Sequence, residues 1–125
     1  MERLASKQEV RQAVAEARRE GKRIALIPTM GALHEGHLSL VRAAAERADY
    51  IIVSVFVNPT QFGQGEDFEA YPRDLDRDVD LLGAEGVDLV FAPTPEIMYA
   101  SDAQVTVDPG PLGALYEGAA RPTHF

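Results

Sequence analysis

Hydrophobic residues along this chain alternate between helical spacing and short continuous runs. An apolar residue at every third or fourth position predicts an amphipathic helix, whereas a continuous apolar run predicts a strand that is buried on both faces. The expected elements, in chain order, are a helix at 7–20, a strand at 23–28 that breaks at Pro28, a helix that opens near Gly36, a strand at 50–57, a helix at 74–86 and a strand at 87–93. Helices that alternate with strands imply parallel crossover connections, so the sequence predicts an α/β fold with an open parallel sheet.

The same spacing predicts which side chains face the core. The first helix follows a Ser-x-x-Glu capping box at residues 6–9. The expected inward residues are Val10, Ala13, Val14 and Ala17 in the first helix, Leu38, Val41, Ala44 and Ala45 in the second, and Leu75, Val79 and Leu82 in the third. Acidic residues crowd the first turns of the third helix, where they complement the positive end of its dipole. Beyond Ala92 the pattern predicts a loop with one helical turn at 93–99, a short strand at 103–108, and a loop with a short helix at 110–125.

Composition and charge narrow the possible classes of function. The chain has 125 residues and a net charge of −8, with the acidic surplus in residues 48–125, which disfavours a nucleic-acid partner. One local site for a small anion is still compatible with this charge. The absence of cysteine excludes a disulfide framework and a thiolate metal site. The sequence has no apolar run of membrane-spanning length and begins with no signal-peptide core, so we expect a cytoplasmic protein without a membrane partner.

Two of the three histidines stand close together in the stretch “IPTMGALHEGH”, residues 27–37. This stretch follows the first predicted strand, at the edge of the sheet where open α/β folds bind ligands. Gly31 permits a tight turn, Gly36 lets a ligand approach the backbone, and the N-terminus of the following helix attracts anions. His34 and His37 lie one helical turn apart. Either can donate a hydrogen bond to a phosphoryl oxygen, and a developing negative charge would favour their protonated forms.

Other interpretations of these residues stay open at this point. The spacing His34-Glu35-Gly36-His37 differs from the His-Glu-x-x-His zinc motif, and no further ligand cluster accompanies Glu35, so we predict no metal site. Both histidines could instead be solvated residues at a helix start. Asn58 and Gln61 follow the next strand, where they either fix a small polar substrate or satisfy the loop backbone. The residues alone therefore predict a phosphate-handling α/β domain and no narrower function.

Four longer stretches carry a family resemblance: “IPTMGALHEGHLSLVRAA”, “VSVFVNPTQFGQGEDFEAYPRDLDRD”, “GVDLVFAP” and “LYEGAARPTHF”. Together they resemble the pantoate–β-alanine ligases of the His-x-Gly-His nucleotidyltransferase superfamily. The resemblance implies a Rossmann-like open parallel sheet with flanking helices. It implies a reaction in which ATP and pantoate, with Mg²⁺, give pantoyl adenylate, from which β-alanine then displaces AMP to give pantothenate. It also implies a homodimer.

The resemblance further implies roles for particular residues. The ATP-binding loop would comprise Met30, Gly31, Ala32, Leu33, His34, Glu35, Gly36 and His37. Within it, His34 and His37 would stabilise charge on the phosphates, and His37 is the residue usually given a catalytic role. Gln61 would bind pantoate and later help to place β-alanine. Pro28, Met30 and Phe62 would form the walls of the pantoate pocket, and Asn58 would support it. His124 would lie near the entry of the amine.

Members of this family have longer chains, which continue past the position of Phe125 with further phosphate-binding motifs. We therefore expect residues 1–125 to form the N-terminal part of a nucleotide-binding domain, apparently truncated, with the C-terminal lid domain absent. Two alternatives remain: a nucleotide-binding module without turnover, and a related nucleotidyltransferase that acts on a phosphorylated acceptor. The loop at 58–63 argues against the transferase because it places an amide, rather than cations, at the acceptor site.

Overall fold

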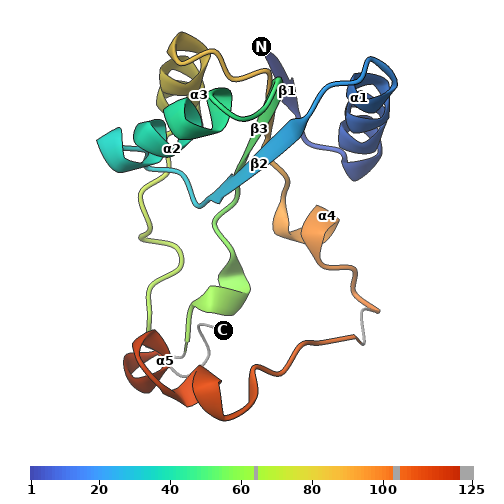
Figure 1. The fold of residues 1–125 in the computed structure, drawn as a ribbon. Helices are drawn as coiled ribbons and strands as arrows, with labels where there is room; N and C mark the ends of the chain where they lie inside the picture. The colour runs from blue at the N-terminus through green and yellow to red at the C-terminus, as the bar shows by residue number, and fades with distance from the viewer. Residues whose placement is uncertain (64, 103–104, 122–125) are drawn as a thin grey trace.

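Four parallel strands form the sheet at the centre of the computed structural model, which describes residues 1–63, 65–102 and 105–121. The strands are β1 (Glu2–Leu4), β2 (Ile24–Thr29), β3 (Tyr50–Val55) and β4 (Leu89–Phe91). They lie in the order β1-β4-β3-β2, and each neighbouring pair is parallel (Figure 1). This arrangement confirms the predicted α/β fold with an open parallel sheet.

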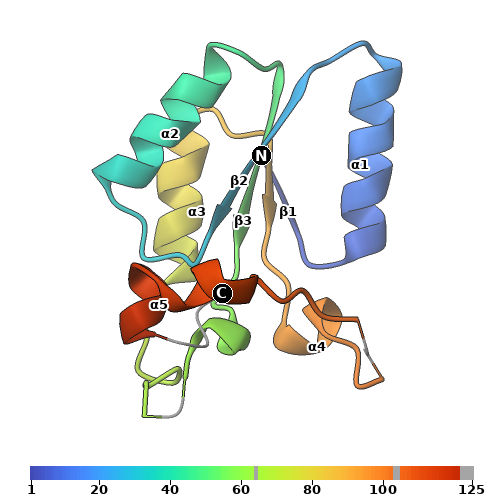
Figure 2. The ribbon, with the colours of Figure 1, turned by 60° about the horizontal axis from the view of Figure 1, so that its bottom comes forward.

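Helices cover both faces of the sheet. α1 (Lys7–Arg19) lies on one face, and α2 (Glu35–Ala45) and α3 (Leu75–Ala84) lie together on the other (Figure 2). The Ser6 side chain caps α1 by accepting a hydrogen bond from the Glu9 N–H at 3.4 Å. The short elements beyond the carboxyl ends of the strands are η1 (Pro59–Gln61), α4 (Pro95–Met98), η2 (Gly110–Ala114) and α5 (Glu117–Ala120). The sheet edge expected to bind a ligand is therefore surrounded by loops and single helical turns.

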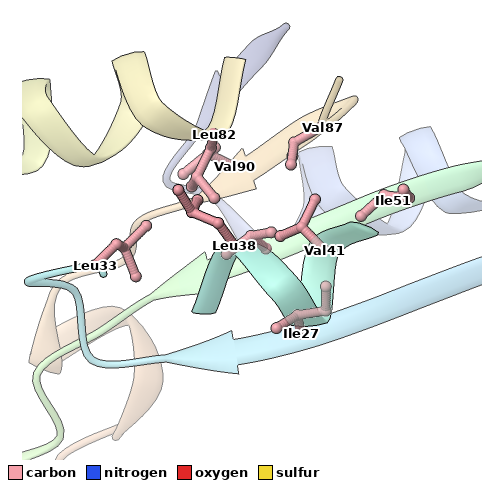
Figure 3. Close-up of a cluster of buried hydrophobic side chains, with 9 residues drawn as sticks. Ile27, Leu33, Leu38, Val41, Ile51, Leu82, Val87 and Val90 are labelled. Atoms are coloured by element: carbon pink, nitrogen blue, oxygen red, sulfur yellow. The ribbon is translucent and has the colours of Figure 1, made fainter. Parts of the chain in front are cut away.

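The main hydrophobic core fills the space between the sheet and the α2–α3 pair (Figure 3). Its buried residues are Ile27, Leu33, Leu38, Val41, Ile51, Val53, Leu82, Val87 and Val90. Val53 and Val90 have no exposed surface, as expected for inner strands covered on both faces. On the opposite face Ala17 of α1 is buried, whereas Leu26 of β2 remains 61% exposed. The predicted inward residue Ala45 is also exposed, because it is the last residue of α2 and lies beyond the packed part of that helix.

β3 and β4 are shorter than the predicted strands at 50–57 and 87–93, and the two other strands differ from the prediction in other ways. β2 continues through Pro28 to Thr29, although the proline was expected to end it. Within the described sheet β2 is an edge strand that pairs only with β3, and an edge strand tolerates a proline that has no N–H to donate. β1 was not predicted, because three residues with one half-buried apolar side chain, Leu4, carry too little pattern. Its register with β4, in which Glu2 lies opposite Leu89, supplies the order that the local sequence lacks.

The predicted strand at 103–108 is wrong for the part of it that the structure describes. Residues 105–108 form no strand, and residues 103–104 lie outside the described ranges. Val105 and Val107 are 94% and 88% exposed, so local β propensity here has no neighbouring strand to satisfy the backbone. The helical turn expected at 93–99 is α4, and the short helix expected after residue 110 is α5. The end of that last segment, residues 122–125, also lies outside the described ranges.

Candidate functional site

A cavity of about 830 Å³ opens between α1, the face of the sheet that α1 covers, and the loops at the carboxyl ends of β2 and β3. Among the residues that line it are five of those predicted from the sequence: Pro28, Met30, His37, Asn58 and Gln61. The rest of the lining is mostly apolar and comes from α1, from the strands and from the segment around α4. Apolar walls with a few convergent polar groups are the usual make-up of a small-molecule site. The fold thus brings the two predicted loops to one cavity.

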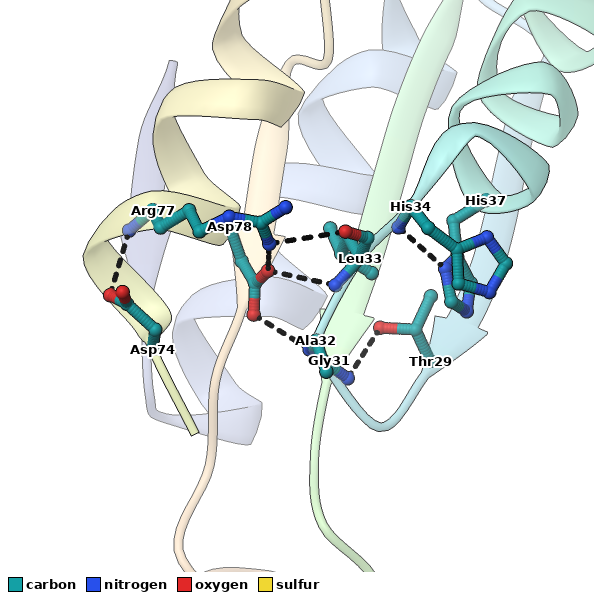
Figure 4. Close-up of polar contacts among 9 residues, drawn as sticks. All are labelled: Thr29, Gly31, Ala32, Leu33, His34, His37, Asp74, Arg77 and Asp78. Carbon is teal, nitrogen blue, oxygen red and sulfur yellow. Dashed lines mark hydrogen bonds and ion pairs between the residues drawn. The ribbon is translucent and has the colours of Figure 1, made fainter. Parts of the chain in front are cut away.

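The side chains of His34 and His37 together form a capping box at the start of α2 (Figure 4). The His34 Nδ1 accepts a hydrogen bond from the Gly36 N–H at 3.0 Å, and the His37 Nδ1 accepts one from the His34 N–H at 3.1 Å. The ring centroids lie 4.1 Å apart. Because each Nδ1 acts as an acceptor, the neutral rings carry their proton on Nε2. Each ring can therefore donate one hydrogen bond through Nε2 without disturbing the cap.

The surroundings of His37 favour its neutral form in this ligand-free state. Burial lowers the pKa of His37 below its ordinary value of 6.5, and the neighbouring His34 lowers it further, whereas Asp78 acts in the opposite direction. Protonation of Nδ1 would also remove the acceptor that the His34 N–H uses. The protonated form of His37 expected from the sequence would therefore need a bound anion to favour it.

The loop between β2 and α2 is held by side chains from two other elements. The Thr29 hydroxyl donates to the Ser54 carbonyl at 2.9 Å and accepts from the Gly31 N–H at 3.2 Å. The Asp78 carboxylate accepts from the backbone N–H groups of Ala32 at 3.0 Å and Leu33 at 2.9 Å. These contacts fix the backbone immediately before the histidine pair (Figure 4).

Sequence reasoning missed Asp78, although a signal for it exists. Residue 78 falls at helical spacing between Leu75 and Leu82, both predicted to face inward, so an acidic residue there stands on the core face of α3. A carboxylate on a core face requires hydrogen-bond partners. Complementing the helix dipole is therefore an incomplete account of Asp78, which is 1% exposed.

Asn58 serves its loop and also faces the cavity. Its Oδ1 accepts hydrogen bonds from the Thr60 N–H at 3.1 Å, the Thr60 hydroxyl at 2.8 Å and the Tyr99 hydroxyl at 2.8 Å. Three donors on one oxygen assign the orientation of the amide, so the Nδ2 amino group is its remaining donor. The two interpretations left open for Asn58 are therefore compatible. Tyr99, beyond β4 in the sequence, is a further residue of this network that the sequence pattern did not reveal.

Phe62 and Glu35, also predicted from the sequence, do not line the cavity. Phe62 is half-buried and packs edge-on against Phe68 and Tyr71, and Tyr71 in turn lines the cavity. Glu35 forms an ion pair with Arg42 on the exposed side of α2. His124 lies outside the described residues. In the part of the chain that the structure describes, no three His, Asp or Glu side chains gather closely enough to hold a metal ion, and no helix is long and apolar enough to span a membrane.

Known proteins resemble this chain along nearly its whole length. The family model described as “Pantoate-beta-alanine ligase” matches residues 2–125. A pantothenate synthetase from Nocardia farcinica is 63% identical over 105 residues, which cover 84% of this chain and 33% of that protein. A pantothenate synthetase from Rubrobacter xylanophilus is 57% identical over 129 aligned residues, covering 98% of this chain and 44% of the relative. The chain therefore spans less than half of the length of these relatives.

Solved structures give the same result for the fold. A pantothenate synthetase from Thermus thermophilus superposes with a TM-score of 0.81 at 48% identity, covering all of this chain and 44% of that one. A pantoate-beta-alanine ligase from Francisella tularensis, complexed with “Beta-gamma ATP” and β-alanine, superposes with a TM-score of 0.88 at 33% identity. That match covers 99% of this chain and 48% of the other. At these levels of identity and overlap, the arrangement of helices and strands is shared.

Proposed function

This chain belongs to the pantoate-beta-alanine ligase family, and we propose that the protein carrying it joins pantoate to β-alanine in an ATP-dependent reaction through a pantoyl adenylate. The observation that carries this proposal is the convergence of His37, Asn58 and Gln61, from two loops, on one cavity. The ATP and β-alanine named for the Francisella tularensis relative are the ligands proposed for the same region here.

The reaction needs positioning and charge stabilisation more than covalent chemistry. A carboxylate oxygen of pantoate attacks the α-phosphorus of ATP and pyrophosphate leaves, which gives a mixed anhydride with AMP. The amine of β-alanine then attacks the acyl carbon, AMP leaves, and the amine proton passes to solvent or to the leaving phosphate. Both steps profit from donors that point at the phosphate oxygens, where negative charge accumulates. A closed cavity would also protect the adenylate from water.

The histidine pair is suited to this task because its donors are free of the cap. In the proposed complex, the Nε2–H groups of His34 and His37 donate to phosphate oxygens, while each Nδ1 continues to hold the start of α2. The backbone of residues 30–37 would surround the nucleotide. Negative charge on the phosphates raises the pKa of a nearby imidazole, so binding would move His37 toward the protonated form that stabilises anions best.

The second loop would recognise pantoate. Pantoate combines a carboxylate and two hydroxyl groups with a dimethyl-substituted carbon, so it requires both polar and apolar contacts. Gln61 and the Nδ2 group of Asn58 would bind its oxygens, and Pro28 and Met30 would pack against the methyl groups. Phe62 would support this wall through Tyr71. His124 belongs to the proposal as a residue near the entry of the amine.

Three further points belong to the same proposal. Magnesium would enter with ATP, held by its phosphates, and no residue of this chain is assigned to it. The protein would act in the cytoplasm and as a homodimer. Residues 1–125 would supply the nucleotide-binding half of the site. The lid domain and the remaining phosphate-binding groups would lie in the part of the longer chain that corresponds to the unmatched length of the relatives.

The test is exchange of labelled pyrophosphate into ATP by the protein that carries these residues. We expect exchange only when pantoate and magnesium are both present, because the adenylate forms before β-alanine reacts. His37→Ala should lower the exchange rate by about 10²-fold, the usual loss when one donor to a developing anion is removed. The matched control is Arg47→Gln, an exposed change just beyond the far end of α2, which should leave exchange unchanged.

Other outcomes identify the alternatives. Exchange driven by a phosphorylated acceptor instead of pantoate would favour a related nucleotidyltransferase. ATP binding without any exchange would favour a binding module. Near-normal exchange by His37→Ala would remove His37 from the catalytic role.

A further inference from the structure

A single acidic side chain, among the residues that the structure describes, is buried within the hydrophobic core. Asp78 on α3 is 1% exposed, and both of its oxygens accept hydrogen bonds from backbone N–H groups, those of Ala32 and Leu33. A carboxylate that leaves water needs strong replacement partners. The N–H groups supply them at 3.0 and 2.9 Å, and the Arg77 guanidinium lies 3.5 Å from the Asp78 Oδ1. The carboxylate and the loop thus stabilise each other.

The loop adopts a conformation that it would not choose by itself. Ala32 has a φ of +51°, a left-handed backbone that disfavours any residue with a Cβ atom. The preceding Gly31 has a φ of +80°, and a Cβ there would lie 3.0 Å from the Asp78 Oδ2 and 3.1 Å from the Val55 Cγ1. Strained backbone of this kind persists only where surrounding groups determine it. Asp78 is the group that bonds to both peptide units of the strained segment.

The strained loop leads directly into the histidine pair. Leu33 is buried, and its carbonyl accepts from the Arg77 guanidinium at 3.1 Å, so residues of α3 hold both the N–H and the C=O of this residue. The next backbone N–H is that of His34, which donates to His37. A shift of Leu33 would therefore move the donor that orients the His37 ring.

We propose that Asp78 is a positioning residue: its buried carboxylate holds residues 31–33 so that the His34 N–H orients the His37 ring, whose Nε2–H faces the cavity. This inference rests on the function proposed above, which gives this Nε2–H group its task. Arg77 adds a second contact by donating a hydrogen bond to the Leu33 carbonyl. Neither Asp78 nor Arg77 needs to contact a substrate. Loss of either side chain would shift the loop and so change the direction of the imidazole donors that bind the substrate.

Asp78→Asn is the most direct test, because it conserves size and removes one acceptor. Its amide can accept from only one of the two N–H groups and turns its own NH₂ toward the other. In the protein that carries this chain, we expect pyrophosphate exchange to fall at least tenfold. In spectra of the ligand-free protein, we expect the amide signals of Ala32 and Leu33 to move. The ¹⁵N shifts of His34 and His37 should lose the signature of a single Nε2–H tautomer.

A matched control separates positioning from loss of stability. Val87→Ala removes buried methyl groups at the opposite end of the sheet, where Figure 3 shows Val87 far from Leu33. It should lower the melting temperature as Asp78→Asn does, yet leave the imidazole spectra unchanged and keep exchange within twofold. Equal loss of exchange in both variants, or unaltered imidazole spectra in Asp78→Asn, would overturn the proposal.

A second variant keeps the proposal testable if the first one does not fold. If Asp78→Asn does not fold, Arg77→Gln takes its place, because the Arg77 side chain is 53% exposed and its loss removes the donor to the Leu33 carbonyl and the longer 3.5 Å contact with Asp78, while the Asp78 carboxylate and both of its N–H partners stay. Unchanged imidazole spectra and unchanged exchange in that variant would contradict the proposal. The spectra need no substrate, so the positioning role stands or falls separately from the ligase function: failure of the wild-type protein to exchange pyrophosphate would refute that function alone.

Discussion

The His37 side chain lines the cavity and also accepts a hydrogen bond from the backbone N–H of His34 at the start of α2. These surroundings determine the pKa of its imidazole. We predict that its midpoint lies below the ordinary value of 6.5, because burial and the neighbouring His34 both lower the pKa. Unfolding would restore the ordinary pKa, so the unfolded chain binds the proton first as the pH falls. The contribution of His37 to stability is therefore complete above pH 6.5 and is lost as the pH falls through the folded-state midpoint.

The measurement is a titration of the imidazole signals by NMR, together with unfolding midpoints on both sides of pH 6.5. His37→Gln is the matched variant, since it lacks a titrating group and should show a smaller fall in stability over this interval. A midpoint at or above 6.5 in the ligand-free protein would contradict the prediction. Addition of ATP should raise the midpoint, because phosphate charge favours imidazolium.

At the scale of single residues, the sequence identified candidate residues by their own chemical type and missed residues whose contacts lie with a distant part of the chain. His37, Asn58 and Gln61 could be recognised because each follows a strand at the carboxyl edge of a parallel sheet. Asp78 and Tyr99 could not, because their roles require Leu33 and Asn58 as neighbours across 45 and 41 residues of chain. No local pattern records such a pairing, although an acidic residue on a core face was a partial signal.

The α2 helix offers a way to separate the structural and chemical roles of a histidine. The His34 ring caps this helix by accepting from the Gly36 N–H. We predict that His34→Ala lowers the free energy of unfolding by about 1 kcal/mol, the usual cost of losing an N-terminal cap. His34→Asn should recover most of this loss, because an asparagine oxygen can accept the same bond. Urea unfolding of the two variants measures the difference.

Pyrophosphate exchange should not follow this recovery. An asparagine at this position restores the cap, but its short side chain carries no ring Nε2–H for the proposed bond to a phosphate oxygen, so exchange should stay low in both variants. If His34→Asn proves as unstable as His34→Ala, the ring does not act as a cap. If exchange recovers together with stability, the contribution of His34 to the reaction is only structural.

The elements themselves were predicted where a pattern had room to develop. The apolar patterns that predicted the three long helices and the strands β2, β3 and β4 each extend over enough residues, and the structure contains all six elements, although β4 itself spans only Leu89–Phe91. β1 is too short to show a pattern, and it exists because β4 offers an unoccupied edge. Residues 105–108 represent the converse case, in which β-branched side chains are present but the described part of the chain supplies no partner strand. Strand formation depends on that partner more than on propensity.

Over the whole molecule, the large exposed apolar side chains concentrate in one stretch. Val105, Val107, Leu112, Leu115 and Tyr116 are all between 49% and 94% exposed, and they follow one another within twelve residues of an otherwise acidic chain. Exposed apolar side chains favour association between molecules, because contact removes their surface from water. We predict that the 125-residue chain associates with itself as its concentration rises, and that Val105→Ser with Val107→Ser weakens this association. Sedimentation velocity over a range of concentrations measures it.

Stability distinguishes this surface effect from an effect on folding. Both valines are almost fully exposed, so their replacement removes very little buried apolar surface, and the melting temperature of the dilute chain should not change. Leu26→Gln is the comparison, because Leu26 is 61% exposed on the face of β2 that lines the cavity, and its replacement would interrupt association only if that face of β2 were the contact. A melting temperature that falls by several degrees in the double serine variant would show that these valines are buried in the folded chain. Association that persists in that variant but is lost in Leu26→Gln would assign the contact to β2 instead.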